Sequence, residues 1–468
     1  SLGSAALGLL MAAGLVQHAA AGELLVYRLG EWPAPFGIVM VVDRLSALMV
    51  LLTYLVAVPV LWYATGGWDT RGRHFHALFQ FQLMGINGAF LTGDLFNLFV
   101  FFEILLIASY ALLVHGGGAE RVRAGLHYVV LNLVGSAFFL LAVGVLYGIT
   151  GTLNMADMAI RVAAAGPDDA ALLGAAGLLL LVVFGLKAAF LPLYFWLPKA
   201  YASATAPVAA LFAIMTKVGL YSIIRVYTLI FGDEAGSLAN MAGDWLWPIA
   251  LLTLALGVIG ALAAVSLQGL LAYLVVVSVG TLLAGIAIGT EQALAAALYY
   301  LVHSTWVAGG LFLLADLIAR QRGDKQALLV QGPALQNPHL LGGLFFFGAI
   351  AVAGLPPLSG FLGKLLLLRS LEPGVQALML WPVVLGGGLL TLVALSRAGS
   401  MLFWRVGLSQ LDSAELDYGR LLACAGLLLL SLVLMVGAAP LLSYVEATAS
   451  QLHDLALYRQ IIESGAAR

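Results

Sequence analysis

The sequence is short of charge. Asp, Glu, Lys and Arg make up 9% of its 468 residues, and 62% of the residues are hydrophobic. A soluble globular domain has about 25% charged residues, so a chain with this composition cannot face water on all sides. The formal net charge of −2 provides no basic field of the kind that binds nucleic acid. Most of this chain is therefore expected to be solvated by lipid.

Cysteine is almost absent. The single residue, Cys424, lies in the apolar run LLACAGLLLL and has no partner for an intrachain disulfide. Without a cysteine cluster, neither an iron–sulfur group nor a structural zinc site is indicated. We expect the chain to carry no cofactor and no metal of its own.

A basic leader is also missing. The chain opens with Ser1 and has no Lys or Arg before Arg28, whereas a secretory signal peptide begins with a basic region. Residues 1–20 are therefore predicted to form a membrane helix, and we expect that some sequence is missing upstream of it.

Long apolar runs are abundant. A membrane-spanning helix needs about 20 apolar residues. The strands of a membrane barrel would instead show alternating polarity over segments of about 10 residues. The runs here are continuous, which predicts an all-α integral membrane protein with thirteen transmembrane helices in this chain. They lie at 1–20, 40–64, 74–92, 95–115, 122–150, 169–192, 205–231, 245–266, 270–290, 292–319, 340–368, 376–404 and 418–440.

Two segments outside these runs have their own patterns. The stretch between the first two runs is rich in aromatics, Gly and Pro, which predicts an extracytoplasmic hairpin within an N-terminal unit at 1–73. The unit at 405–468 is expected to hold the last helix and an amphipathic tail. From about residue 441, that tail is predicted to form a helix on the membrane surface.

Charged loop residues predict the orientation. Basic residues gather in alternate loops, and the intervening loops carry mostly acidic residues. Because positive loops stay in the cytoplasm, the first set is predicted to be cytoplasmic, with Ser1 inside and Arg468 outside. The basic set is Arg71, Arg73, Arg121, Arg123, Lys199, Arg320, Arg322, Lys325, Arg405 and Arg420; the acidic set is Asp94, Asp157, Asp168, Asp169, Asp233, Glu234, Asp244, Glu291 and Glu372.

A few ionisable residues fall inside the runs. Each costs at least about 2.5–3.5 kcal/mol at a helix centre, so a purely structural protein has little reason to carry several. A lysine near a helix end can snorkel to the interface, which suits Lys364, and a histidine such as His303 can simply bond a carbonyl. Glu103 and Lys187 lie too deep for these explanations and have opposite charges. The candidate proton-pathway residues are Glu103, Lys187, Lys217, His303 and Lys364.

Two of these lysines adjoin broken helices. Proline removes a backbone donor and breaks a helix, and such breaks inside a membrane are tolerated only against protein or water. Matching broken helices in two halves are a sequence pointer to a transport path. We predict two inverted five-helix repeats at 74–231 and 245–404. The residues that break the helices are Pro192 and Pro198 after Lys187, and Gly354, Pro356, Pro357 and Gly360 before Lys364.

Three segments carry a family resemblance that covers essentially the whole chain. They are VFFEILLIASYALL, GLKAAFLPLYFWLPKAYASATAPVAALFAIMTKVGLY and GLPPLSGFLGK. They resemble the antiporter-like subunits, which include the large membrane subunits of respiratory complex I and of Mrp-type cation/proton antiporters. The stretch WPAPFGIVMVVDRLSALMVLL is most similar to the D-type subunit of the Mrp antiporters, also called Pha or Mnh. The resemblance implies a fourteen-helix family fold, partner subunits, and a place in the bacterial inner membrane.

The resemblance also implies residue roles. Glu103 matches the glutamate that is paired with the broken-helix lysine, Lys187, and Lys217 matches the connecting lysine of the next helix. His303 matches the histidine of the central polar axis, and Lys364 matches the last lysine of the second repeat. The chain departs from the family where Val307 replaces a frequent lysine and where Gln268 and Gly269 replace basic residues. The central axis is therefore expected to depend more on His303 and water.

Three functions fit these observations. The favoured one is the proton-translocating subunit of a multisubunit Na⁺(K⁺)/H⁺ antiporter, a transporter rather than an enzyme, with the cation crossing partly through another subunit. The alternative is a proton-pumping membrane subunit of a complex I-like or membrane hydrogenase redox complex, which soluble redox partners would reveal. A receptor or scaffold would have no need of a buried Lys–Glu pair.

Overall fold

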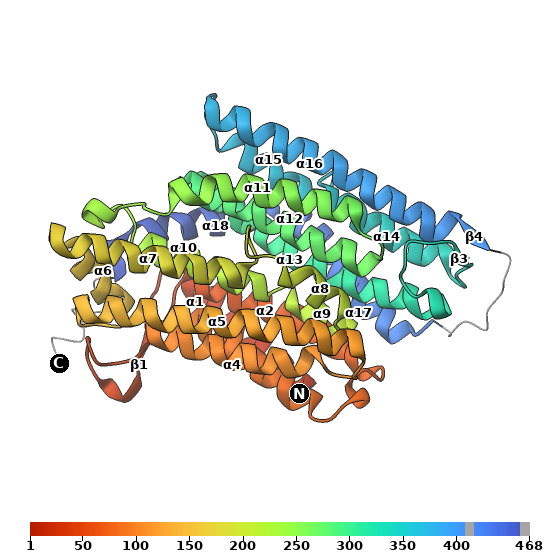
Figure 1. Cartoon of the computed structure of the whole chain (residues 1–468), viewed down its shortest axis with the longest axis horizontal. Coiled ribbons are helices and arrows are strands. Elements are labelled where there is room, and N and C mark those ends of the chain that lie inside the picture. Colours follow the sequence, from red (N-terminus) through yellow and green to blue (C-terminus); the bar gives the residue numbers. More distant parts are fainter. Residues whose placement is uncertain (408–415, 459–468) are drawn as a thin grey trace.

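The computed structural model describes residues 1–407 and 416–458. Long helices run roughly parallel to one another and to the longest axis of the molecule (Figure 1). The helices of the first half are α1 (Leu2–Ala20), α2 (Arg44–Thr65), α3 (Phe75–Leu91), α4 (Leu95–Leu113), α5 (Ala119–Thr150), α6 (Met155–Ala163), α7 (Pro167–Ala188), α8 (Trp196–Ser203), α9 (Ala206–Phe212) and α10 (Met215–Leu229). Those of the second half are α11 (Gly243–Ala263), α12 (Leu267–Ile288), α13 (Glu291–Arg320), α14 (Pro338–Ala353), α15 (Ser359–Arg369), α16 (Val375–Gly399), α17 (Tyr418–Val436) and α18 (Ala438–His453).

Each of the thirteen apolar runs contains helix. Within the described residues, eleven helical segments are long and apolar enough to cross a membrane, and one of them combines α9 and α10. The other two runs differ from a continuous span. Helix α3 has 17 residues, and run 340–368 is divided into α14 and α15. An integral membrane fold of many helices is confirmed, while the count of thirteen spans stays a prediction.

Strands are few and short. β1 (Leu25–Arg28) pairs antiparallel with β2 (Val39–Val42), so the chain forms a hairpin where one was expected, and its extracytoplasmic position stays a prediction. β3 (Gly332–Pro333) pairs in parallel with β4 (Val406–Gly407) at the opposite end of the bundle (Figure 1).

Helix α13 forms the centre of the bundle. It packs on α2, α9, α12, α14, α15, α17 and α18, and most of its residues are buried. Its burial places His303 where the two halves of the chain meet.

Helix α18 differs from the predicted tail. The amphipathic helix forms, but its apolar residues Val445, Ala449 and Leu452 are buried against protein, with α13, α2 and α10 as neighbours. Neighbouring helices therefore cover the face that was expected to enter lipid, and a position of α18 on the membrane surface stays a prediction. The rest of the expected tail, 459–468, lies outside the described residues.

The two ends of the bundle carry opposite charges. Arg71, Arg121 and Arg320 line one cavity, at what we call the basic end. At the other, acidic end, Asp94 pairs through its backbone with Asn154, and α6, which carries Asp157, packs on the short 3-10 helix Gly236–Leu238. Burial raises the pKa of Asp94 to about 6. The alternation of charged loops therefore corresponds to two real ends of the molecule.

Candidate ion pathway

The first part of the site joins α4, α5 and α7. Ser136 on α5 donates a short hydrogen bond to Oε1 of Glu103. Nζ of Lys187, 4% exposed, lies 3.5 Å from the same hydroxyl and 3.4 Å from Oδ1 of Asn132. Glu103 and Lys187 are thus brought together as expected, but through a serine, and they are absent from the direct ion pairs of the described chain. Sequence reasoning missed Ser136 and Asn132, since serine and asparagine on a helix face carry no charge signal.

Lys187 occupies the last turn of α7, the first and longer part of a broken helix. Helix α7 ends at Ala188, where the chain turns toward α8. The indole of Trp196 donates to the carbonyl of Leu186 at 3.0 Å, and the hydroxyl of Thr253 accepts from the amide of Leu191 at 3.0 Å. These bonds hold the break in place. The carboxyl end of a helix carries partial negative charge, so this position favours a lysine cation.

Lys217 lies at the start of α10, directly after the interruption between α9 and α10. Its Nζ donates to Oγ of Ser278 on α12 at 3.2 Å. Gly219, two residues further on, lies against α7. A Cβ there would be 2.5 Å from the amide nitrogen of Ala188 and 2.9 Å from the carbonyl carbon of Lys187. Glycine therefore allows the helices that carry the two lysines to approach closely.

A small cavity lies between Ser278, the hydrogen-bond partner of Lys217, and His303. It has a volume of about 30 Å³ and is lined by Ser278, Tyr300, His303 and Ser304, among others. A space of this size with several polar groups on its wall can hold a water molecule. The cavity thus offers a water-mediated step between Ser278 and His303, in keeping with the apolar replacement at Val307.

His303 has its own hydroxyl partners. Nδ1 lies 2.8 Å from Oγ of Ser359, which lies 2.7 Å from Oγ of Ser431. The imidazole can carry a proton on either nitrogen, so this arrangement suits proton transfer. A Cβ on Gly360 would lie 2.7 Å from Nε2, so the second residue of α15 must be small. Val307 is fully buried and apolar on the same helix.

Lys364 lies on the second broken helix. Its Nζ donates to the carbonyls of Val352 at 3.1 Å and Ala353 at 3.0 Å, which are the last residues of α14. The lysine of one half-helix thus caps the carboxyl end of the other, where the helix dipole favours a cation. Its partners are backbone carbonyls inside the protein rather than the interface that a snorkelling lysine would reach.

A large cavity opens at the basic end. Its volume is about 610 Å³, and its wall includes Thr205, Phe312 and Asp316. Oδ2 of Asp316 accepts from the hydroxyl of Tyr63 at 2.6 Å and the indole of Trp68 at 3.0 Å. Arg320 forms an ion pair with the same oxygen at 2.7 Å. Asp316 falls within run 292–319, near its end, and sequence reasoning passed over it.

The geometry can be compared with known proteins. The family model described as NADH:quinone oxidoreductase/Mrp antiporter, TM, matches residues 92–393. The chain belongs to this family. The match includes all five candidate pathway residues.

Two relatives within the family indicate which type of subunit the chain resembles. The D-type subunit of a probable K(+)/H(+) antiporter from Rhizobium meliloti is 44% identical, covering 91% of this chain and 84% of the relative. The D-type subunit of the Na(+)/H(+) antiporter of Bacillus subtilis is 38% identical, covering 97% and 91%. The resemblance to the D-type subunit of the Mrp antiporters is thereby confirmed.

Solved structures agree on the fold. A chain of the Mrp complex from Dietzia sp. DQ12-45-1b superposes with a TM-score of 0.86 at 26% identity, covering 98% of this chain and 93% of that one. A chain of respiratory complex I from Thermus thermophilus gives 0.80 at 25% identity, covering 97% and 94%. A chain of the archaeal membrane-bound sulfane sulfur reductase gives 0.88 at 25% identity, covering 98% and 93%.

Proposed function

We propose that this chain is the D-type subunit of a multisubunit Na⁺ or K⁺/H⁺ antiporter in a bacterial inner membrane. Protons pass along Glu103, Lys187, Lys217, His303 and Lys364, and the partners are other subunits of the complex and the lipid bilayer. The observation that carries the proposal is the Glu103–Ser136–Lys187 bridge, in which a hydroxyl lies between a partly buried acid and a buried base. The relatives are named as antiporter subunits, which supports a transporter rather than an enzyme.

The topology follows from the charged ends. We place the basic end in the cytoplasm, because positive loops remain there. Thirteen spans then alternate through the membrane, with inverted repeats at 74–231 and 245–404 between the terminal units 1–73 and 405–468. Two broken helices support the repeats, α7 with α8 and α14 with α15, each with a lysine at or against the carboxyl end of its first half.

The bridge supplies a switch. A carboxylate stabilises the charged form of a nearby amine in a dry interior, and loss of that contact favours release of the proton. The Ser136 hydroxyl contacts both groups, so a small shift of α4 or α7 changes how strongly the charges interact. A released proton can then move toward Lys217, the cavity at His303 and Lys364. Charge at one position favours or opposes charge at the next, which links the steps.

Transport in everted vesicles tests the proposal. Glu103→Gln, Lys187→Ala and the double variant are compared by dequenching of a pH dye after Na⁺ or K⁺ is added, with complex assembly measured beside transport. We expect normal assembly, no antiport in either single variant, and no rescue in the double variant, because the proton carrier is lost. Removing one partner of a buried ion pair can cost about 3–5 kcal/mol, so a structural pair would instead show poor assembly and recovery in the double variant.

Two surface residues provide matched controls. Glu291 and Lys325 are exposed residues of the same types, and Glu291→Gln and Lys325→Ala should transport normally. Near-normal dequenching by a well-assembled Lys187→Ala complex would contradict the mechanism and move attention to Lys217 and His303.

A redox role is the second candidate, since chains of a sulfane sulfur reductase and of complex I share this fold. Gentle solubilisation followed by native mass spectrometry separates the two. Iron–sulfur subunits in the purified complex would favour the redox role, and their absence from an active, multisubunit antiporter would favour the first.

A further inference from the structure

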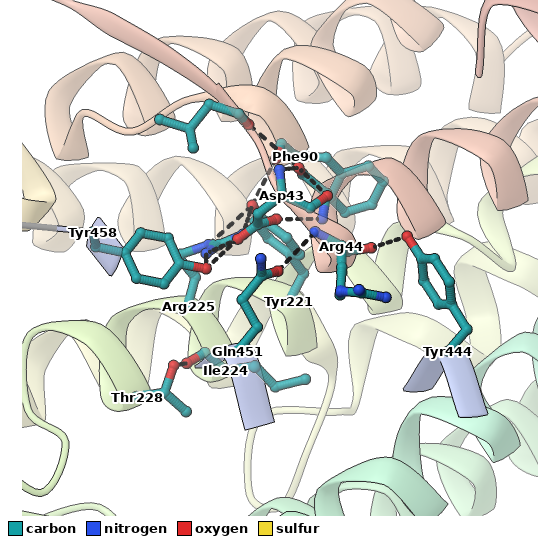
Figure 2. Close-up of polar contacts among 12 residues, drawn as sticks. Asp43, Arg44, Phe90, Tyr221, Ile224, Arg225, Thr228, Tyr444, Gln451 and Tyr458 are labelled. Atoms are coloured by element: carbon teal, nitrogen blue, oxygen red, sulfur yellow. Dashed lines mark hydrogen bonds and ion pairs between the residues drawn. The ribbon is translucent and has the colours of Figure 1, made fainter. Parts of the chain in front are cut away.

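A buried charged cluster lies at the acidic end of α10, away from the proposed pathway residues. Arg225 forms a two-point ion pair with Asp43, with nitrogen–oxygen distances of 2.5 and 2.9 Å. Its Nη1 also donates to the hydroxyl of Tyr458 at 3.1 Å, and its Nε and Nη2 donate to that of Tyr221 at 3.2 and 3.1 Å. Figure 2 shows these groups converging on one guanidinium. Every nitrogen of the guanidinium therefore has an acceptor.

The carboxylate is equally well satisfied. Asp43 lies just before the span of α2 and caps that helix by accepting from the amide of Ser46 at 2.8 Å. It also accepts a short hydrogen bond from the hydroxyl of Tyr458. The ion pair with Arg225 and the hydrogen bonds from Tyr458 and Ser46 compensate the carboxylate for its burial. The pair is thus fixed in its charged form.

The cluster is dry. The side chains of Arg225 and Asp43 are 5% and 0% exposed. The cavities that Tyr458 lines have volumes of only about 10 and 20 Å³. That is room for about one water molecule each. The cavity at the basic end, by contrast, has about 610 Å³.

The C-terminal segment covers this cluster. The carboxamide of Gln451 accepts from the amide of Arg44 at 3.0 Å, and the hydroxyl of Tyr444 donates to the carbonyl of Arg44 at 2.9 Å (Figure 2). These contacts dock α18 on the first residue of α2 and bring Tyr458 over Arg225. Two aromatic rings flank the guanidinium, with Tyr221 at 5.3 Å and Tyr458 at 5.7 Å from ring centre to carbon.

We propose that the C-terminal segment 438–458 is a seal: Tyr458 closes the acidic end of α10 over the Asp43–Arg225 pair, so that a proton at Lys217 cannot leave by that end. Lys217 and Arg225 lie on the same helix eight residues apart, or about 12 Å along its axis. The donors and acceptors of the ion pair are already taken up by each other and by the tyrosine hydroxyls, and the packed rings leave little room for the water that would carry a proton. The inference rests on the proposed proton pathway.

A leak measurement tests the seal. Everted vesicles containing the whole complex are given a pH gradient in medium free of Na⁺ and K⁺, with a permeant anion to balance charge, and passive decay of the gradient is followed. We expect Tyr458→Ala to accelerate the decay several-fold while the complex assembles, and Tyr458→Phe to do so less, because the ring remains. Tyr418→Ala is the matched control. It removes an exposed tyrosine ring of α17, away from the cluster, and it should not leak.

Thiol labelling gives a second readout that does not depend on transport. Leu229 is 6% exposed and lines both small cavities beside Tyr458. In a Cys424→Ser background, Leu229→Cys should react with an impermeant maleimide from outside intact spheroplasts only when Tyr458→Ala is also present. An unchanged leak rate together with an unreactive Leu229→Cys would overturn the seal. Loss of antiport without a leak would also overturn it, by placing Tyr458 in the transport path. Absence of antiport in the unmodified complex would contradict the proposed function instead.

Discussion

Ser136 connects the two charged residues at the start of the proposed pathway. The sequence predicts that Glu103 and Lys187 belong together, because opposite charges deep in a membrane need partners. It does not predict that a serine connects them, since Ser136 lies in an apolar run with no pattern to mark it. Its hydroxyl donates to the carboxylate and lies 3.5 Å from the ammonium nitrogen. A one-atom change therefore tests the bridge without removing either charge.

We expect Ser136→Ala to lower the antiport rate about tenfold or more while the complex assembles. A hydrogen bond to a charged group contributes about 1.5–3 kcal/mol, and about 1.4 kcal/mol corresponds to a factor of ten. Dye dequenching in everted vesicles measures the rate. Ser109→Ala is the control, because this buried serine bonds the neutral hydroxyl of Tyr128 at 2.9 Å. Equal rates in the two variants would show that the bridge does not matter.

At the scale of elements, the contact between α13 and α15 positions the central histidine. The prolines of GLPPLSGFLGK predict the break before α15, but the sequence cannot say what the following glycine faces. In the structure, a Cβ on Gly360 would lie 2.0 Å from the carbonyl oxygen of Ala351 and 2.7 Å from Nε2 of His303. The start of α15 is thus fitted between α14 and the histidine.

Gly360→Ala should therefore displace His303 or α15. Overpacking of this kind costs about 1–3 kcal/mol. We expect a lower thermal midpoint of the purified complex together with loss of antiport. Gly386→Ala on α16 is the matched control, since a Cβ there meets open space. A Gly360→Ala complex that equals this control in midpoint and in transport would contradict the proposed contact.

The existence of the helices can be predicted from the sequence, but their packing partners cannot. Apolar runs predict helices well, because lipid leaves the backbone no other partner than itself. The position of α18 does not follow from its sequence, because an amphipathic face can be covered by headgroups or by protein, and the pattern is the same in both cases. Likewise, Asp43 and Arg225 lie 182 residues apart at the ends of different runs, so nothing local indicates that they form one buried pair.

At the scale of the whole molecule, the separation of charge between the two ends predicts the orientation in the membrane. In a Cys424→Ser background, Asp324→Cys at the basic end and Ser237→Cys at the acidic end both place an exposed thiol. Impermeant thiol reagents should label position 324 only from the cytoplasmic side and position 237 only from outside. Reversed labelling would invert the direction assigned to every step of the pathway.

The contrast between the open basic end and the closed acidic end also bears on how the protein responds to membrane voltage. An open cavity of about 610 Å³ is large enough to fill with water from the adjoining solution, and its interior then has nearly the electrical potential of that solution. The voltage across the membrane then falls mainly over the dry remainder, where one elementary charge changes in energy by about 2.3 kcal/mol per 100 mV. A proton that enters from the basic end thus moves at first through almost no field, and the electrical work is concentrated in the steps beyond the cavity.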